Sequence, residues 1–259
     1  MTTPLDSQRQ LSAPLDLDNG SRFELKYRLS YFQYLKIRHE LQIYMKQDQY
    51  TRQVPENRYL VRSLYYDTYD YRAYDQKMNG DSERVKFRVR TYKASQSEVE
   101  QVRIELKMRQ GNLTNKKNVF VPLGEYQHFM ESRHWRKMLT PITMEFEAMV
   151  LRRNIMPKVL VEYDREGYQT RMKSDLRITF DHNLRSAHAS RLFPEPCFFQ
   201  PHIPSRVIME IKFSKEYPRW LSSLVRNHGL KVIANSKYTQ AIQVARHDLV
   251  YPAHVITVR

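Results

Sequence analysis

The chain of 259 residues is poor in glycine and has no long hydrophobic run. Its six glycines form neither a Gly-x-x-x-x-Gly-Lys phosphate loop nor a Gly-x-Gly-x-x-Gly dinucleotide loop. Any phosphate group that this protein binds must therefore be held by side chains. No apolar stretch approaches the length that crosses a bilayer, and residues 1–20 lack the hydrophobic centre of a signal peptide.

The chain also lacks a second cysteine and a cluster of histidines. The single Cys197 excludes an internal disulfide and agrees with a reducing compartment. Nine histidines are scattered without the spacing of a zinc site. These features predict a cytoplasmic protein without a membrane span of its own.

Acidic residues are outnumbered, with 28 Asp and Glu against 43 Lys and Arg, for a formal net charge of +15. Such an excess attracts polyanions, whether nucleic acid, anionic membrane or polyphosphorylated small molecules. Net charge alone does not distinguish these classes of ligand, so the arrangement of the charges along the sequence is needed.

One stretch, Glu83–Tyr92, alternates strictly between cations and apolar residues. Arg84, Lys86, Arg88 and Arg90 point one way, and the residues between them are Val, Phe and Val. Period-two alternation predicts a strand, because successive side chains leave opposite faces of the pleated backbone. Four like charges in register indicate either a basic surface strand or one wall of a polyanion site.

The remaining chain supplies more strands of the same kind and several helices. Ser30 followed by Gln33 is a capping-box pattern that opens a helix from about Tyr31 to Met45. Residues 1–20 are expected to be a disordered lead-in and 46–57 a polar connector. Further strands are expected over 22–29, 58–68, 102–109, 116–122, 158–169, 176–184 and 206–214, and further helices over 125–139, 144–154, 218–227 and 237–247.

About eight strands without a long linker predict a single α+β domain over residues 21–259. We expect a closed antiparallel eight-stranded β-tunnel with helices packed on the outside, since a barrel of this size can hold one small ligand. The helices need the apolar strand faces, which leaves the charged faces to line the lumen. That inner face holds Lys26, Arg62, Lys86, Arg88, Arg90, Lys107, Arg165, Arg177 and Lys212, opposed chiefly by Glu24, Glu105 and Glu210.

A buried unpaired charge costs several kcal/mol even after relaxation. This excess of cations is therefore tolerable only in a wet tunnel that holds a multiply charged anion. Arginine binds phosphate oxygens with two parallel hydrogen bonds, and lysine acts as a point charge. Carboxylates in so basic a lumen are best explained as ligands of a divalent metal that bridges phosphates.

The strand motifs resemble the polyphosphate polymerase domain of the vacuolar transporter chaperone (VTC) proteins, in the triphosphate tunnel metalloenzyme (CYTH-like) superfamily. The motifs are Phe23-Glu24-Leu25-Lys26-Tyr27, Ser63-Leu64-Tyr65-Tyr66-Asp67, Lys86-Phe87-Arg88-Val89-Arg90, Glu105-Leu106-Lys107 and Glu210-Ile211-Lys212, with Ser236-Lys237 near the end. The resemblance runs from about residue 21 to 247. It implies an ATP-dependent enzyme that transfers the γ-phosphoryl group to a growing polyphosphate chain.

The resemblance also implies roles for individual residues. The reacting phosphates would contact Lys26, Arg88, Arg90, Lys212 and Lys237, and substrate-binding contacts would come from Arg62, Lys86, Lys107, Tyr163, Arg165, Arg177 and Ser236. Glu210, with Glu24 as second candidate, would hold Mn²⁺ or Mg²⁺. Whether Glu24 and Glu105 bind metal or pair with neighbouring cations stays open.

Hydrolytic members of the superfamily open with Glu-x-Glu-x-Lys, whereas Arg22 stands first here. The missing carboxylate favours polymerase over triphosphate hydrolase or cyclase, which are the enzymatic alternatives. A non-catalytic polyphosphate-binding module is a further alternative. Nucleic-acid binding ranks last, since most tyrosines fall at core-compatible spacings rather than forming stacking platforms. Coupling to a membrane would need a separate partner.

Overall fold

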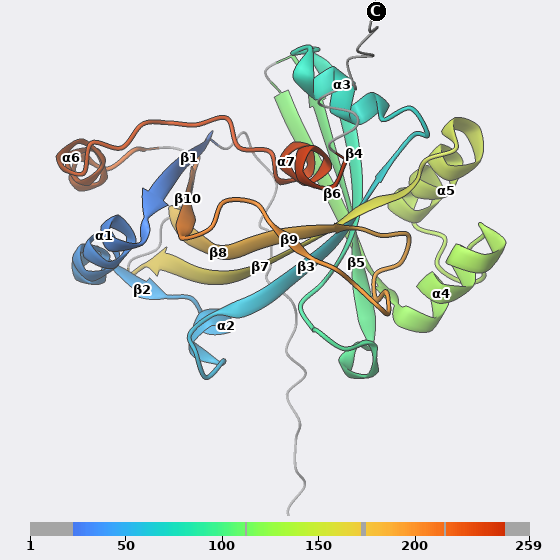
Figure 1. The fold of residues 1–259 in the computed structure, drawn as a ribbon, viewed down its shortest axis with the longest axis horizontal. Coiled ribbons are helices and arrows are strands. Elements are labelled where there is room, and N and C mark those ends of the chain that lie inside the picture. Colours follow the sequence, from blue (N-terminus) through green and yellow to red (C-terminus); the bar gives the residue numbers. More distant parts are fainter. Residues whose placement is uncertain (1–22, 112, 172–174, 215, 247–259) are drawn as a thin grey trace, which may run out of the picture.

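The computed structural model describes residues 23–111, 113–171, 175–214 and 216–246 (Figure 1). The expected lead-in over residues 1–20 and the Arg22 position lie outside these ranges. The strands are β1 (Phe23–Ser30), β2 (Met45–Gln47), β3 (Tyr59–Asp67), β4 (Glu83–Thr91), β5 (Gln101–Gln110), β6 (Leu113–Pro122), β7 (Met156–Thr170), β8 (Arg177–His188), β9 (Gln200–Pro201) and β10 (Arg206–Phe213). The helices are α1 (Tyr31–Tyr44), α2 (Gln49–Arg52), α3 (Arg72–Met78), α4 (Leu123–Ser132), α5 (Pro141–Arg153), α6 (Arg219–Asn227) and α7 (Lys237–Ala245), with a 3₁₀ turn at Gln96–Glu98.

The strands form one antiparallel sheet, which confirms the α+β class. Eight of them follow the order β1-β10-β8-β7-β3-β4-β5-β6, while β2 pairs with β7 and β9 pairs with β8. Within the described residues no backbone pairing joins β1 to β6, so a closed tunnel is not confirmed. The sheet instead curves round so that the β1–β10 wall faces the β4–β5–β6 wall (Figure 1).

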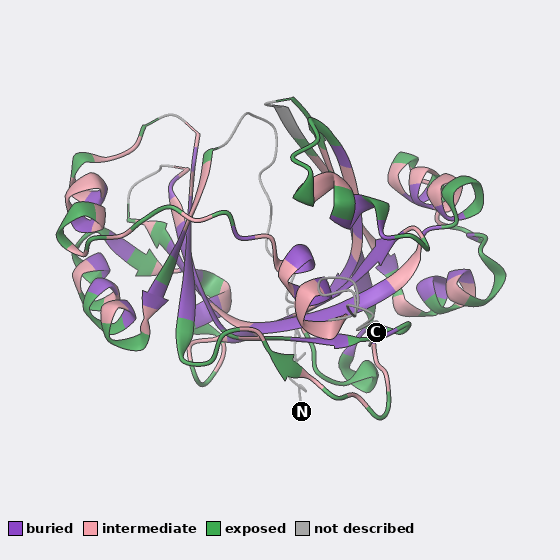
Figure 2. Cartoon of the chain, turned by 45° about the horizontal axis from the view of Figure 1, so that its top comes forward, coloured by how far each residue is buried: buried purple, intermediate pink, exposed green. Residues whose placement is uncertain are grey.

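Helices cover the convex face of the sheet at both ends. The apolar side of β4, with Phe87 and Val89, packs in a core with Phe129, Trp135 and Phe146 from α4, α5 and the segment between them. At the other end, residues of α1 and α6 pack on the outer face of β1, β8 and β10. Figure 2 shows this layering: much of each strand is buried (purple), and the helices at both ends of the sheet have exposed outer faces (green).

Helix α7 departs from the expectation that helices lie only outside. Its Tyr238, Ala241 and Ile242 pack with Tyr65 and Tyr163 on the concave face of β3 and β7. Figure 1 shows α7 between the two walls of the sheet. The reason is that the central strands carry apolar and aromatic side chains on the concave face as well, and these need a cover.

The helix starts agree with the capping signals in the sequence. The Ser30 hydroxyl accepts from the Gln33 N–H, and the Gln33 side chain accepts from the Ser30 N–H. Ser236 caps α7 by accepting from the Thr239 N–H. Both predicted caps are confirmed, because N-caps depend on local sequence.

Short elements were missed. The expected connector over 46–57 holds α2 and most of β2, and β9 lies in a segment where no strand was expected. Elements of two to four residues are too short to show a periodic pattern. The α2 cap, Asp48, lies so close to Gly167 on β7 that a Cβ there would meet its Oδ2 at 2.1 Å, so Gly167 is required for this contact.

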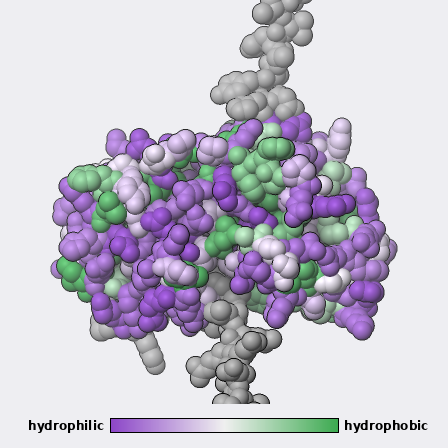
Figure 3. All heavy atoms as spheres, turned by 60° about the horizontal axis from the view of Figure 1, so that its bottom comes forward, coloured by the Kyte–Doolittle hydropathy of each residue, from purple (hydrophilic) through white to green (hydrophobic). Residues whose placement is uncertain are grey.

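In the described part of the chain no helix has both the length and the apolar character to span a bilayer. The face drawn in Figure 3 is mostly hydrophilic, with apolar residues in small separate groups.

Candidate functional site

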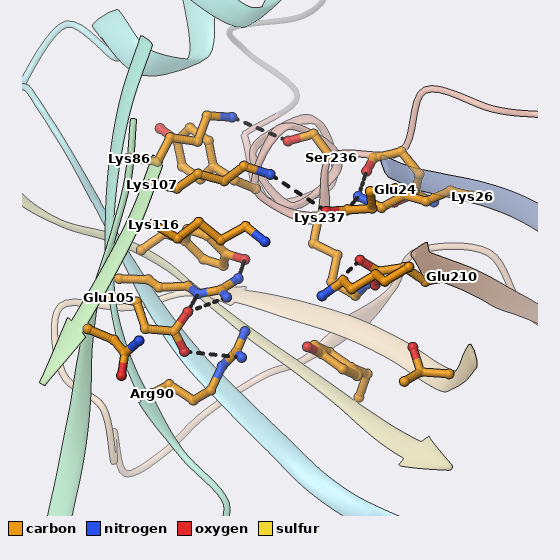
Figure 4. Close-up of a pocket in the computed structure, with 18 of the residues that line it drawn as sticks. Glu24, Lys26, Lys86, Arg90, Glu105, Lys107, Lys116, Glu210, Ser236 and Lys237 are labelled. Carbon is orange, nitrogen blue, oxygen red and sulfur yellow. Dashed lines mark hydrogen bonds and ion pairs between the residues drawn. The ribbon is translucent and has the colours of Figure 1, made fainter. Parts of the chain in front are cut away.

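The concave face of the sheet and the start of α7 surround a cavity of about 380 Å³. Of the described residues that line it, fifteen are Lys or Arg and three are Glu. The close-up in Figure 4 shows that the side chains converge from facing walls: Lys86, Lys107 and Lys116 from one side, and Glu24, Lys26 and Glu210 from the other. The charged strand faces therefore point inward.

Nearly all the residues expected at the site line this cavity. They are Glu24, Lys26, Lys86, Arg88, Arg90, Lys107, Tyr163, Arg165, Arg177, Glu210, Lys212, Ser236 and Lys237. The structure thus brings together residues from β1, β4, β5, β7, β8, β10 and α7. Their roles toward a substrate remain proposals.

Arg62 is the exception, because it lies on the convex face of β3. Its neighbours Tyr59, Ser63 and Tyr65 alternate onto the concave face, where Tyr59 and Tyr65 line the cavity. The Arg62 guanidinium pairs with Glu162, its cross-strand partner on β7. The mid-strand cation is therefore explained by a buried carboxylate on the outer face rather than by the cavity.

Glu105 on β5 gathers one group of arginines in the cavity wall. Its Oε2 accepts from Arg88 Nε at 2.8 Å, and its Oε1 lies 3.1 Å from Arg90 Nη1 and 3.9 Å from Arg103 Nε. Burial alone would raise the pKa of Glu105, but Arg88, Arg90 and Arg103 lower it to about 2. The sequence left open whether Glu24 and Glu105 bind metal or pair with cations, and the structure shows that Glu105 pairs with cations.

Asp181 on β8 is the shared partner of a second group of cations, which lies beneath the cavity. It accepts from Arg165 at 2.7 and 2.9 Å, and Lys237 Nζ lies 2.5 Å away. Burial opposes its ionisation, but Arg165 and Lys237 lower the pKa of Asp181 to about 2. The Arg165 guanidinium also lies 3.5 Å from Glu210. Asp181 thus holds Arg165 of β7 next to Lys237 at the start of α7.

Glu24 and Glu210 are the candidate metal ligands. They lie diagonally on the same face of adjacent strands, since Lys26 is opposite Glu210 and Glu24 opposite Lys212. Burial opposes the ionisation of Glu210, but Lys212, Lys26, Lys237 and Arg165 hold its pKa well below the ordinary value. Both carboxylates also contact lysines, at 2.6 Å for Glu24–Lys26 and 3.5 Å for Glu210–Lys212.

No group of three potential ligands among His, Cys, Asp and Glu occurs within the described residues. A pair of ionised carboxylates nevertheless fits a divalent cation such as Mg²⁺, which takes one or two carboxylates and completes its shell with phosphate oxygens and water. The donor set present is therefore suited to a metal that arrives with a phosphate substrate, and unsuited to one held by protein alone.

Lys86 on β4 and Lys107, opposite it on β5, both have lowered pKa values. Burial first, and then the nearby Lys107, Arg84 and Lys77, lower the pKa of Lys86 to about 7. Lys86 Nζ donates to Ser236 Oγ at 3.3 Å, and Lys107 Nζ lies 3.9 Å from Glu24. The first contact joins β4 to the start of α7, and the second joins β5 to β1 (Figure 4).

Several lining residues were not expected at the site. They include Lys77, Arg84, Arg103, Arg109, Thr179 and Asn235. Strand alternation places Arg103 and Arg109 on the face of Glu105 and Lys107, so this signal was available. Lys77 from α3 and Asn235 from the segment before α7 are brought to the cavity by tertiary packing alone.

The site thus lies on the cationic concave face of a curved antiparallel sheet. The VTC domain family matches residues 21–246, and the chain belongs to that family. The resemblance drawn from the strand motifs is thus confirmed. No curated protein matches the sequence.

Solved structures show a similar fold at low identity. A Bacillus halodurans protein described as a "putative adenylate cyclase" is 12% identical, with a TM-score of 0.50, over 84% of this chain and 94% of that one. The PH1819 protein of Pyrococcus horikoshii OT3 is 12% identical, with a TM-score of 0.44, over 86% and 98%. The Mimivirus capping enzyme triphosphatase is 15% identical, with a TM-score of 0.34, over 81% and 88%. The first of these likenesses supports the fold alone.

Proposed function

We propose that this protein is an ATP-dependent polyphosphate polymerase, which transfers the γ-phosphoryl group of ATP to the end of an inorganic polyphosphate chain. The observation that carries the proposal is the charge imbalance of the cavity, with fifteen Lys and Arg lining residues against three Glu. Cations so concentrated repel one another, and a polyanion offsets that repulsion. Membership of the VTC domain family points to the same substrates.

The reaction forms one bond and breaks one. A terminal oxygen of the chain attacks the γ-phosphorus, the bond from that phosphorus to the β–γ bridging oxygen breaks, and ADP leaves. The transition state spreads negative charge over the equatorial oxygens, so alignment and neutralisation supply most of the catalysis. The proposed catalytic residues are Lys26, Arg88, Arg90, Lys212 and Lys237.

These catalytic residues are held in place before substrate binds. Arg88 is fixed by Glu105 and by the Tyr65 hydroxyl, 3.0 Å from its Nη1, and Arg90 donates to Ser63 Oγ at 3.1 Å. Lys237 is held by Asp181. Such donors need little reorganisation at the moment of reaction, which is the condition for electrostatic catalysis.

The remaining cavity residues bind and orient the substrate in this proposal. They are Lys86, Lys107, Tyr163, Arg165, Arg177 and Ser236; Arg62 is left out because of its place on the convex face. Glu210 and Glu24 would hold the Mn²⁺ or Mg²⁺, which would neutralise phosphate charge. Arg177 is oriented by Asp48, 2.8 Å from its Nη2.

The test incubates the pure protein with ATP and Mn²⁺, or Mg²⁺, and resolves the products on a gel stained for polyphosphate. Long chains together with ADP are expected. Orthophosphate or pyrophosphate as the only product would overturn the proposal in favour of hydrolysis or cyclisation. Binding without turnover would instead identify a polyphosphate-binding module.

A further inference from the structure

The cations of the β4–β5–β6 wall are arranged in rows across the strands. Arg84 is directly opposite Arg109, Lys86 opposite Lys107, Arg88 opposite Glu105, and Arg90 opposite Arg103. Lys116 on β6 extends the second row, opposite Lys107. Consecutive rows are two residues apart along each strand, which is about 7 Å.

The two ends of this wall differ in their counter-ions. At one end Glu105 contacts Arg88, Arg90 and Arg103. At the other end Arg84 is buried, with 9% of its surface exposed, and within the described ranges it has neither an ion pair nor a side-chain hydrogen bond. Arg109 Nε donates to the Gly111 carbonyl at 2.9 Å. Among the residues that the structure describes, no carboxylate forms an ion pair with either arginine at this end.

Lys77 adds a third cation at the same place. It reaches the cavity from α3 and lines it together with Arg84 and Arg109. Burial, Arg84 and Arg109 lower the pKa of Lys77, and burial followed by Arg109 lowers that of Arg84, while Asp81 acts weakly in the opposite direction. Like charges directly opposite each other on neighbouring strands destabilise a sheet. An anion between them would remove that cost.

We infer that Lys77, Arg84 and Arg109 form a second anion subsite, which binds the distal phosphates of a polyphosphate chain whose reacting end lies beside Arg88 and Arg90. The inference rests on the proposed function and adds to it a means of preferring long chains. Arg84 and Arg88 are four residues apart along β4, about 13 Å. One triphosphate group bound at Arg88 and Arg90 therefore does not extend as far as Arg84 and Arg109.

Inorganic polyphosphate fits this subsite better than a single-stranded nucleic acid. Proteins that bind single strands without sequence preference combine cations with aromatic side chains on which bases stack. The rows at this end contain Arg84, Lys86, Lys107, Arg109 and Lys116, and none of these positions is aromatic. The centroid of the Tyr238 ring lies 5.0 Å from Lys86 Nζ, but the ring is buried and offers no free face on which a base could stack. The ligand expected here has charge and no bases.

The test compares the Arg84→Gln/Arg109→Gln double variant with the wild type. Dissociation constants are measured for inorganic tripolyphosphate and for a long linear polyphosphate over a series of salt concentrations. The variant should bind the long chain at least about 10-fold more weakly, with a salt dependence shallower by about one to two phosphate contacts. Binding of tripolyphosphate should stay within about 2-fold, because the contacts at Arg88 and Arg90 remain.

Two further variants control for charge and folding. Arg133→Gln/Arg191→Gln removes two exposed arginines outside the cavity and should leave both ligands unaffected. Arg84→Lys/Arg109→Lys keeps the charge and should restore most of the preference for the long chain. Thermal melting of each variant shows that it is folded.

The outcomes separate this subsite from the proposed function. If the wild type binds neither phosphate ligand, the proposed function itself fails. If the wild type binds both, and the double variant loses both equally or neither, the subsite is overturned while the function stands. Tighter wild-type binding of a single-stranded oligonucleotide than of polyphosphate would also overturn the subsite.

Discussion

The Nζ of Lys237, in the first turn of α7, lies 2.5 Å from Oδ2 of Asp181 on β8. This ion pair fastens α7, which packs on the concave face, to the sheet beneath it. Asp181 is fully buried and accepts two hydrogen bonds from Arg165 as well. A single carboxylate thus holds two of the cavity's cations in position.

Asp181→Asn should lower the free energy of unfolding by about 3–5 kcal/mol, because it removes the carboxylate that contacts the largely buried Lys237 and Arg165. Arg165 is then left with the longer contact, 3.5 Å, to Glu210. Urea unfolding at neutral pH measures the change. Asp164→Asn is the matched control, since Asp164 is half-buried and contacts Asn183; it should cost less than about 1 kcal/mol. Equal, small effects of the two substitutions would contradict the anchoring role of Asp181.

Polyanion binding above neutral pH should be accompanied by proton uptake at Lys86. Burial lowers the pKa of Lys86 to about 7, so at pH 8 it is mostly neutral in the free protein, and a bound polyanion favours its charged form. Affinity should therefore fall as pH rises through this range. Calorimetry in buffers of different ionisation enthalpy measures the protons taken up.

Lys86→Arg should remove most of this uptake, because arginine stays charged throughout. Lys107, whose pKa is lowered to about 8 by burial, accounts for the remainder. Lys46→Arg, at an exposed position on β2, is the control and should change nothing. Undiminished proton uptake in Lys86→Arg would refute the assignment.

Glu105→Gln should destabilise the protein in a pH-dependent way. The folded-state pKa of Glu105 is about 2, against 4.5 for the unperturbed group, which corresponds to about 3 kcal/mol of stability. That contribution is present above pH 4.5 and is lost as the pH falls toward 2, because the unfolded chain takes up the proton first. The stability difference between wild type and variant should shrink over this window.

Denaturant unfolding at a series of pH values follows this difference. Glu145→Gln serves as the control, since Glu145 forms a partly exposed ion pair with Lys117. Its effect should be below about 1 kcal/mol. If the stability difference between the wild type and Glu105→Gln stays constant from about pH 5 to about pH 2, the arginines do not depend on this carboxylate.

Glu210→Gln should abolish metal-dependent turnover while ATP still binds, if Glu210 holds the metal. The measurement besides activity is Mn²⁺ affinity in the presence of a non-hydrolysable ATP analogue, which should fall at least about 10-fold. Glu216→Gln, at an exposed position after β10, should leave both readouts intact. Near-normal turnover and Mn²⁺ affinity in Glu210→Gln would remove the metal assignment.

The site could be predicted where local sequence decides it. The alternation of Glu83–Tyr92 placed Arg84, Lys86, Arg88 and Arg90 on one face, and all four line the cavity. The same rule failed for Arg62, because both faces of β3 are largely apolar and alternation does not say which is concave. Only the pairing of Arg62 with Glu162 on β7 resolves its direction.

The sequence by itself determined the eight longer strands, the caps of α1 and α7 and the inward row of cations, because these depend on side-chain period and neighbours a few residues away. Tertiary structure decided which cations are neutralised, since Glu105, Asp181 and their arginines come from different strands. It also decided that α7 lies on the concave face and that, over the described part of the chain, no backbone pairing joins β1 to β6. Both follow from long-range packing and pairing, which no local pattern encodes.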